Sequence, residues 1–171
     1  SDKLIKEKKW KINFKNLDEE SATAKRQLML ATQIIKYVDS DQPIRFLVAE
    51  CEQSISIFSS LFLAKKLDID KNIDISPLFE TRHGLEYGEE VIKDLLSQNI
   101  FIDYIKSRGR ISIQTGFSDA GRFIGQIAAS FAIEKLQLKI AELLFKKKEL
   151  NIDFLLFNTH GESLGRGGTQ S

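Results

Sequence analysis

Hydrophobic residues fall into four short, nearly continuous runs, separated by longer stretches in which apolar residues recur every three or four positions. The short runs are rich in Ile, Val, Phe and Leu, which favour β-strands. They cover Ile44–Ala49, Ile73–Phe79, Arg110–Phe117 and Ile152–Asn158. Apolar runs without strict alternation are typical of strands buried on both faces, as in parallel sheets. The pattern therefore predicts four parallel strands.

The stretches around these runs have the apolar spacing of amphipathic helices. The predicted helices cover about Leu17–Val38, Ser54–Leu67, Leu85–Gln98 and Ala120–Lys148. In the first helix, the apolar stripe expected to face the core consists of Ala24, Leu28, Ala31, Ile35 and Val38. In the last helix, the residues expected to be buried are Ile124, Ile127, Phe131 and Leu138.

Strands that alternate with helices predict an α/β fold, in which crossover helices connect the strands of a parallel sheet. Two architectures fit this pattern: a small doubly wound sheet, or part of a (β/α)₈ TIM-type barrel. A complete barrel needs about 250 residues, and this chain has 171. We expect one domain over residues 1–171, with an N-terminal arm at 1–16 and a glycine-rich, open C-terminal end at 157–171, and we expect it to be a fragment of a longer protein.

Composition narrows the class of protein. The 25 basic and 24 acidic residues nearly cancel, whereas a nucleic-acid-binding domain normally has a basic excess. The longest apolar run, Ile55–Ala64, is far shorter than the ~20 residues of a membrane span. The only cysteine, Cys51, cannot form an internal disulfide and fits a reducing compartment. We expect a cytoplasmic protein that binds neither nucleic acid nor membrane.

Candidate chemistry lies just beyond the predicted strands, because parallel α/β folds collect functional groups at the C-terminal ends of their strands. Glu80 follows the second strand and Asp119 follows the third. Two carboxylates so placed suit Mg²⁺ or Mn²⁺, which leaves further positions for water and substrate. Two simpler roles stay open: Asp119 is also well placed to cap the last helix, and Glu80 to pair with Arg82.

The C-terminal loop is the second candidate. Arg166 is flanked by glycines at Gly165, Gly167 and Gly168. An arginine beside exposed backbone N–H groups forms the kind of cradle that binds phosphate or carboxylate. On composition alone, the same stretch also fits an unstructured tail.

Three segments, in order and at matching spacing, resemble the phosphoenolpyruvate carboxylase family. Ser76–Thr81 (SPLFET) resembles that family's Pro-Leu-Phe-Glu-Thr, and Gly116–Arg122 (GFSDAGR) resembles its Gly-Tyr-Ser-Asp-Ser-x-Lys. Phe157–Gly168 (FNTHGESLGRGG) resembles its loop Phe-His-Gly-Arg-Gly-Gly-x-x-Gly-Arg-Gly-Gly. The similarity extends weakly back to about Ile44. Three ordered motifs are far more specific than any one of them.

The resemblance implies a central slice of a (β/α)₈ barrel in an enzyme that carboxylates phosphoenolpyruvate with bicarbonate, giving oxaloacetate and phosphate with Mg²⁺ or Mn²⁺. It implies that Glu80 and Asp119 hold the metal and that Ser118 belongs to the substrate site. The implied catalytic residues are Arg122, His160 and Arg166. Arg166 also binds substrate by this analogy, together with Gly165, Gly167 and Gly168.

Four positions depart from the family pattern: Arg122 replaces a lysine, Asn158 a histidine, His160 an arginine and Glu162 a glycine. Glu162 adds negative charge to an anion-binding loop. These four departures, and the parts of the family's barrel that lie outside this chain, lead to a second hypothesis: a barrel remnant without turnover that acts as a binding or structural module. A third is an unrelated doubly wound, anion-binding domain, in which Glu80 and Asp119 would lie far apart. For the isolated chain we expect no activity, and self-association through open strand edges.

Overall fold

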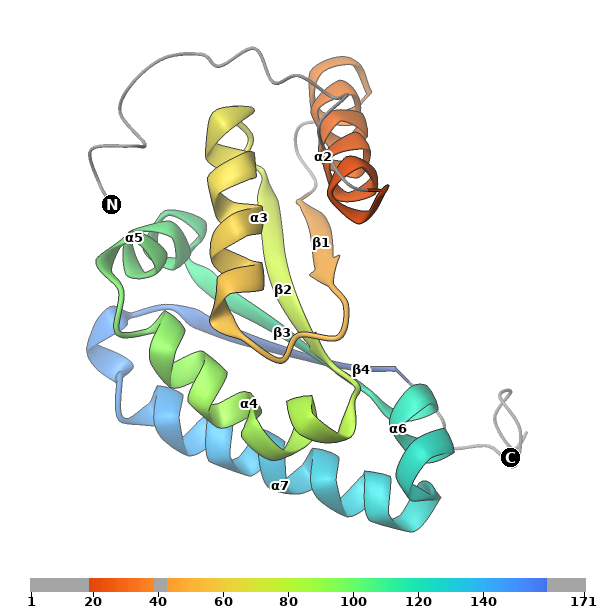
Figure 1. The fold of residues 1–171 in the computed structure, drawn as a ribbon. Helices are drawn as coiled ribbons and strands as arrows, with labels where there is room; N and C mark the ends of the chain where they lie inside the picture. Colours follow the sequence, from red (N-terminus) through yellow and green to blue (C-terminus); the bar gives the residue numbers. More distant parts are fainter. Residues whose placement is uncertain (1–18, 39–42, 160–171) are drawn as a thin grey trace.

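The structure, a computed structural model, describes residues 19–38 and 43–159. Its centre is a parallel sheet with strand order β1-β2-β3-β4 (Figure 1). The strands are β1 (Ile44–Val48), β2 (Ile73–Phe79), β3 (Arg110–Gly116) and β4 (Asp153–Thr159). All four predicted strands are confirmed to within one residue at each end, as is the α/β class.

The helices precede and connect these strands, and one α-helix has no counterpart in the sequence prediction. They are α2 (Glu19–Tyr37), α3 (Ser54–Lys66), α4 (Arg82–Leu95), α5 (Asn99–Arg108), α6 (Phe117–Ile124), α7 (Gln126–Phe145) and a 3₁₀ turn, η2 (Lys148–Leu150). The unpredicted helix is α5. The single long helix expected after β3 is wrong, because the chain breaks at Gly125 (φ 84°, ψ 150°), a conformation that L side chains rarely adopt.

The core lies between the sheet and its helices. Ile73, Ile75 and Phe79 of β2 and Ile111 and Ile113 of β3 are buried in it. Figure 1 shows α4 and α7 lying side by side below the sheet, with α3 in front of β2. The sheet and these helices thus form the two layers expected of crossover connections.

Alternate positions on β2 and β3 carry polar side chains, among them the buried Asp74, Ser76 and Gln114. On the outer strands, the guanidinium of Arg45 (β1) lies 3.2 Å from the ring centre of Phe157 (β4). Strands three places apart in a flat sheet are about 14 Å apart, so this contact requires a curved sheet. A parallel, curved sheet with strand–helix repeats is consistent with part of a TIM-type barrel.

The expectation for the apolar face of the last helix is wrong. Ile127, Phe131 and Leu138 are exposed, and Ile124 is half-buried. The residues of α7 that enter the core are Ala129, Ile133, Leu136 and Ile140. In α2, by contrast, Leu28 and Ala31 are buried as expected, whereas Val38, just after the helix, is exposed. The helix α7 is apolar around most of its circumference, so its sequence does not single out the face that packs on the sheet.

Within the described residues, no helix combines the length and the apolar character needed to cross a membrane.

Candidate functional site

Two carboxylates meet at the C-terminal edge of the sheet. Glu80 follows β2, and Asp119 lies in the first turn of α6, directly after β3. The neighbouring strands pair with Phe79 beside Thr115, which places Glu80 next to Gly116. The side chains of Glu80 and Asp119 lie close enough for the acidic group of Asp119 to raise the pKa of Glu80. This proximity argues against the unrelated anion-binding domain, for which the two carboxylates were expected to lie far apart.

Gly116 allows Glu80 to take this position. A Cβ atom at Gly116 would lie 2.5 Å from the Glu80 Cβ, closer than real Cβ contacts allow, and 3.2 Å from the Glu80 Oε2. From the other side, the backbone N–H of Glu50 donates a hydrogen bond to Glu80 Oε1 at 3.2 Å. Glu80 is thus held between the ends of β1 and β3, and neither contact is evident from the sequence.

The electrostatics of this site favour a cation. Burial raises the pKa of the Glu80 carboxyl group, and the nearby acidic groups of Asp119 and Glu50 raise it further, while the hydrogen bond from Glu50 N–H opposes this. Two carboxylates this close repel each other when both are ionised. A divalent cation between them would remove that repulsion, so the donor set fits a metal ion.

The small number of candidate protein ligands at Glu80 and Asp119 bears on which metal ion would bind there. Among residues 19–38 and 43–159, no group of three or more His, Cys, Asp or Glu side chains is arranged to hold an ion. The part of the chain that the structure describes therefore offers such a cation the two carboxylates of Glu80 and Asp119. Mg²⁺ is commonly bound in this way, with its other positions taken by water and substrate.

Arg122 borders the carboxylate pair. Its Nη1 lies 3.4 Å from Asp119 Oδ1, one helical turn away along α6. Both side chains are largely exposed, so the ion pair contributes little to stability. Because the Arg122 guanidinium is exposed and lies beside Asp119, it is well placed to contact an anion that binds near the carboxylate pair.

The two simpler roles considered for the carboxylates do not describe this structure. The residue that precedes α6 is Gly116, with no side-chain capping bond, so the capping role suggested for Asp119 is wrong. The ion pairs found among the described residues do not join Glu80 to Arg82.

Other candidate residues are placed only in part. The backbone of Ser118 lies in the first turn of α6, between Phe117 and Asp119. The candidate residues of the C-terminal loop lie outside the described residues; these candidates are His160, Gly165, Arg166, Gly167 and Gly168. Glu162, which stands where the family has a glycine, also lies outside them.

Asn158, near the end of β4, belongs to a polar cluster that sequence reasoning missed. Its Oδ1 accepts a hydrogen bond from Gln137 Nε2 of α7 at 2.5 Å and another from the hydroxyl of Thr115. Gln137 Nε2 also lies 3.1 Å from Thr115 Oγ1. No local sequence signal joins residues from β3, β4 and α7. Asn158, which stands where the family has a histidine, is thus held by hydrogen bonds to Gln137 of α7 and to Thr115 of β3.

Cys51, next to Glu50, is buried, and burial raises the pKa of its thiol from 9.0 to about 12. The thiolate is the reactive form, and a rise of this size lowers its population at pH 8 about a thousandfold. We expect the native chain to react with a thiol reagent such as DTNB far more slowly than the chain unfolded in guanidinium chloride. Equal rates in the two states would contradict the buried position.

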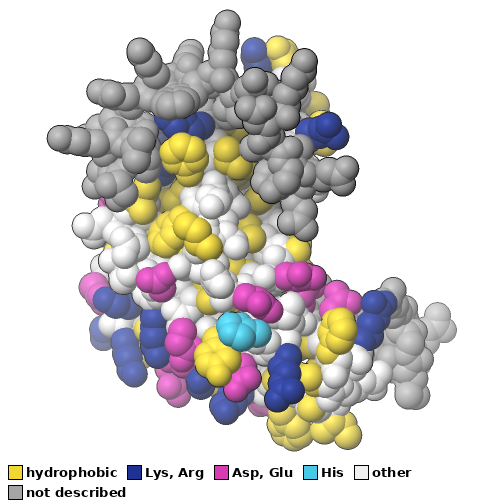
Figure 2. Space-filling view, in the orientation of Figure 1, with side chains coloured by type: hydrophobic (Ala, Val, Ile, Leu, Met, Phe, Trp, Pro, Cys, Tyr) yellow, Lys and Arg dark blue, Asp and Glu magenta, His cyan; other side chains and the backbone are white. Residues whose placement is uncertain are grey.

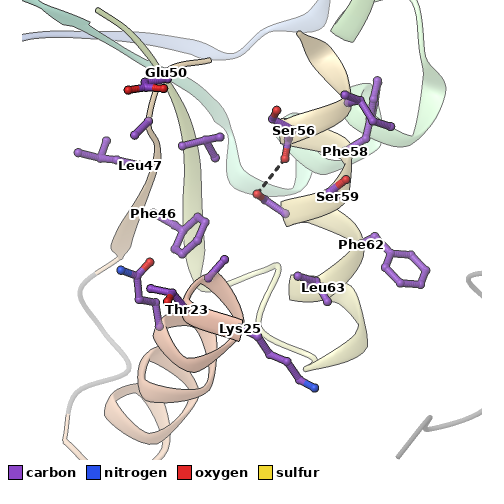
Figure 3. Close-up of a pocket in the computed structure, with 16 residues that line it drawn as sticks. Thr23, Lys25, Phe46, Leu47, Glu50, Ser56, Phe58, Ser59, Phe62 and Leu63 are labelled. Carbon is purple, nitrogen blue, oxygen red and sulfur yellow. Dashed lines mark hydrogen bonds between the residues drawn. The ribbon is translucent and has the colours of Figure 1, made fainter. Parts of the chain in front are cut away.

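A groove of about 1230 Å³ lies between α2, β1 and α3 (Figure 3). Apolar side chains, including Phe46, Phe58 and Phe62, dominate its lining, with Lys25 and Glu50 among the polar residues. It flanks β1, the outermost strand of the described sheet. Parallel α/β folds collect functional groups at the C-terminal ends of their strands, so we place the candidate active site at Glu80 and Asp119 instead.

The parallel strand–helix repeats, with carboxylates at the C-terminal edge of the sheet, define an α/β domain that is consistent with part of a TIM-type barrel. The family model for phosphoenolpyruvate carboxylase matches residues 4–171. The chain belongs to the phosphoenolpyruvate carboxylase family, a family of carboxy-lyases, as the sequence motifs predicted.

Curated relatives agree with this assignment. A phosphoenolpyruvate carboxylase of Corynebacterium diphtheriae is 26% identical over 141 residues, which cover 82% of this chain and 15% of the relative. One from Haemophilus influenzae is 28% identical over 123 residues, covering 72% and 13%. One from Xanthomonas euvesicatoria pv. vesicatoria is 33% identical over 97 residues, covering 56% and 10%. The chain thus spans 10–15% of the length of these relatives.

Proposed function

We propose that this chain is the part of a phosphoenolpyruvate carboxylase that holds its catalytic metal ion. The enzyme joins phosphoenolpyruvate and bicarbonate to give oxaloacetate and phosphate. The observation that supports this most directly is the meeting of Glu80 and Asp119 at the C-terminal edge of the sheet, where α/β barrels bind their substrates. The proposed reaction is taken from the family to which the chain belongs. The proposed site for its cation is the pair Glu80 and Asp119.

Each described residue has a defined part in this proposal. Glu80 and Asp119 are the protein ligands of Mg²⁺ or Mn²⁺. A bound divalent cation would supply positive charge that stabilises the negative charge developing on the substrate. Arg122 orients the Asp119 carboxylate through their ion pair, and it presents a guanidinium group to anionic substrate. As an arginine, it is a poor proton carrier, so we assign it to charge stabilisation.

The remaining roles rest on the resemblance alone. We propose that Arg166 binds phosphate or bicarbonate oxygens with backbone N–H groups around Gly165, Gly167 and Gly168. We assign His160 to the same site, as a donor or titratable group, and Ser118 to the substrate-binding residues. The proposal includes a cytoplasmic location, which the buried, reduced Cys51 supports.

The direct test is an assay for oxaloacetate formed from phosphoenolpyruvate, bicarbonate and Mg²⁺. We expect activity from the longer protein and none from the 171-residue chain, because the chain spans only 10–15% of the length of its relatives. The longer protein without metal is the control. Turnover by the 171-residue chain would contradict the expectation for the fragment. Its absence from the longer protein, folded and loaded with metal, would contradict the proposed function.

One observation favours a second candidate, a barrel remnant that has lost turnover. Asn158 stands where the family has a histidine, and its side-chain oxygen is held by Gln137 and Thr115. An amide cannot transfer protons as an imidazole does. If the longer protein is inactive, replacing Asn158 by His tests whether this position accounts for the loss. Restored oxaloacetate formation would favour the remnant.

A further inference from the structure

Glu50 has an unusual backbone conformation beside the candidate metal site. It lies in the turn that follows β1, and its φ of 46° falls in the left-handed region, which side chains other than Asn and Asp rarely adopt. Figure 3 shows Glu50 at the end of β1, beyond Phe46 and Leu47. Such a conformation persists only where the surrounding structure enforces it, and it is common at functional sites. The backbone of Glu50 therefore points to a function.

The turn that contains Glu50 is held by the end of β2 and by the start of α4. The N–H of Cys51, the next residue, donates a hydrogen bond to the carbonyl oxygen of Leu78 at 3.1 Å. Cys51 is buried, and its carbonyl oxygen lies 3.2 Å from where a Cβ atom at Gly84 would stand. Glu50 cannot take a more common φ without disturbing these contacts.

The result of this conformation is a hydrogen bond to Glu80, a proposed metal ligand. The backbone N–H of Glu50 donates to Glu80 Oε1 at 3.2 Å. The other oxygen, Oε2, lies on the side of β3, because a Cβ atom at Gly116 would stand 3.2 Å from it. Asp119 follows Gly116 by three residues. The hydrogen bond to Oε1 thus leaves Oε2 facing the end of the strand from which Asp119 comes.

The side chain of Glu50 offers a weaker explanation than its backbone. The side chain is exposed. Figure 2 shows acidic side chains gathered across the middle of this view, at the level of the loops that follow β1 and β2 in Figure 1. One exposed carboxylate among several changes the potential at the site only modestly, because water and salt screen it. The backbone N–H, by contrast, contacts Glu80 directly.

We propose that Glu50 is a positioning residue for the cation, an inference that rests on the proposed function of Glu80 and Asp119. Its left-handed backbone places an N–H on Glu80 Oε1, and this hydrogen bond orients Oε2 towards the ion shared with Asp119. A hydrogen bond to a ligating carboxylate fixes its orientation, and losing such a contact typically costs about 10–100-fold in metal affinity. The side chain at position 50 matters chiefly through the backbone conformation that it permits.

Mn²⁺ binding by variants of the longer protein tests this inference, with unbound Mn²⁺ measured by electron paramagnetic resonance. Glu50→Asn and Glu50→Val remove the same charge, but asparagine tolerates the left-handed region and valine does not. We expect Glu50→Asn to raise the dissociation constant by less than about threefold, and Glu50→Val to raise it at least about tenfold. The relevant ion is the one whose binding Asp119→Asn removes. Equal binding by the asparagine and valine variants overturns the inference.

A milder pair of variants covers the case in which Glu50→Val does not fold. Glu50→Gly favours the left-handed conformation and Glu50→Ala disfavours it, so the glycine variant should bind Mn²⁺ at least about threefold more tightly. Circular dichroism establishes that each variant keeps its helices. If these two variants bind Mn²⁺ equally while Asp119→Asn still abolishes binding, the role of Glu50 is wrong and the metal site stands. If the longer protein binds no Mn²⁺ that depends on Asp119, the proposed metal site is wrong, and the role of Glu50 with it.

Discussion

Replacing Asp119 by Asn in the longer enzyme is expected to lower kcat by about 10²–10³, the usual cost of removing one electrostatic stabiliser from an active site. The amide keeps the size of the side chain but loses the charge that a divalent cation requires. Glu80→Gln should have a similar effect, because both carboxylates face the same ion in our proposal. The measurement is oxaloacetate formation at saturating phosphoenolpyruvate and bicarbonate, over a range of Mn²⁺ concentrations.

The matched control is Asp103→Asn, which makes the same chemical change at an exposed aspartate of α5 and should leave kcat unaltered. If Asp119→Asn retained full activity with the same Mn²⁺ dependence, Asp119 would not be a metal ligand.

Loss of folding does not explain the expected effect of Glu80→Gln. The pKa of Glu80 is raised in the folded protein, mainly by burial, so the fold favours its neutral form. Relative to the unfolded chain, this stabilises the folded state below the usual pKa of 4.5, and the contribution is lost as pH rises through the raised pKa. The metal-free variant should therefore be at least as stable as the original chain at neutral pH. Thermal unfolding checks this.

The strands were predictable because each one is a short apolar run, a pattern that a buried parallel strand requires. Their C-terminal ends then located Glu80 and Asp119, since parallel strands bring these ends to one edge. The helices were harder to place. The helix α5 follows α4 after a short turn without a proline or glycine to mark it, and the break at Gly125 depends on a backbone angle that composition does not reveal.

Contacts between distant segments were not predictable at all. The hydrogen bonds of Asn158 with Gln137 and Thr115 depend on how α7 packs against β3 and β4. The choice between the two apolar faces of α7 depends on that packing too. A sequence pattern reports which residues share a face of a helix, but when two faces are apolar it does not report which one meets the sheet.

The second large expected effect is a loss of stability on replacing Gly116, where the end of β3 lies close to Glu80. Replacing Gly116 by Ala is expected to cost about 2–3 kcal/mol of stability, because the added methyl group must displace the backbone or side chain of Glu80. Backbone strain does not contribute, since φ at Gly116 is −105°, which alanine adopts readily. In the longer enzyme the same change should also reduce activity, because it moves a proposed metal ligand. Urea unfolding and the oxaloacetate assay measure the two effects.

Gly121→Ala is the control from the same segment of chain. A Cβ atom at Gly121 meets nothing closer than 3.7 Å, and the residue lies inside α6. Alanine favours a helix over glycine by up to about 1 kcal/mol, so this variant should be as stable as the original chain or more so. The two substitutions add the same methyl group five positions apart, and only one adds it against Glu80. If both had the same small effect on stability, the ends of β2 and β3 would not approach as closely as described, and Gly116 would have no part in positioning the carboxylate.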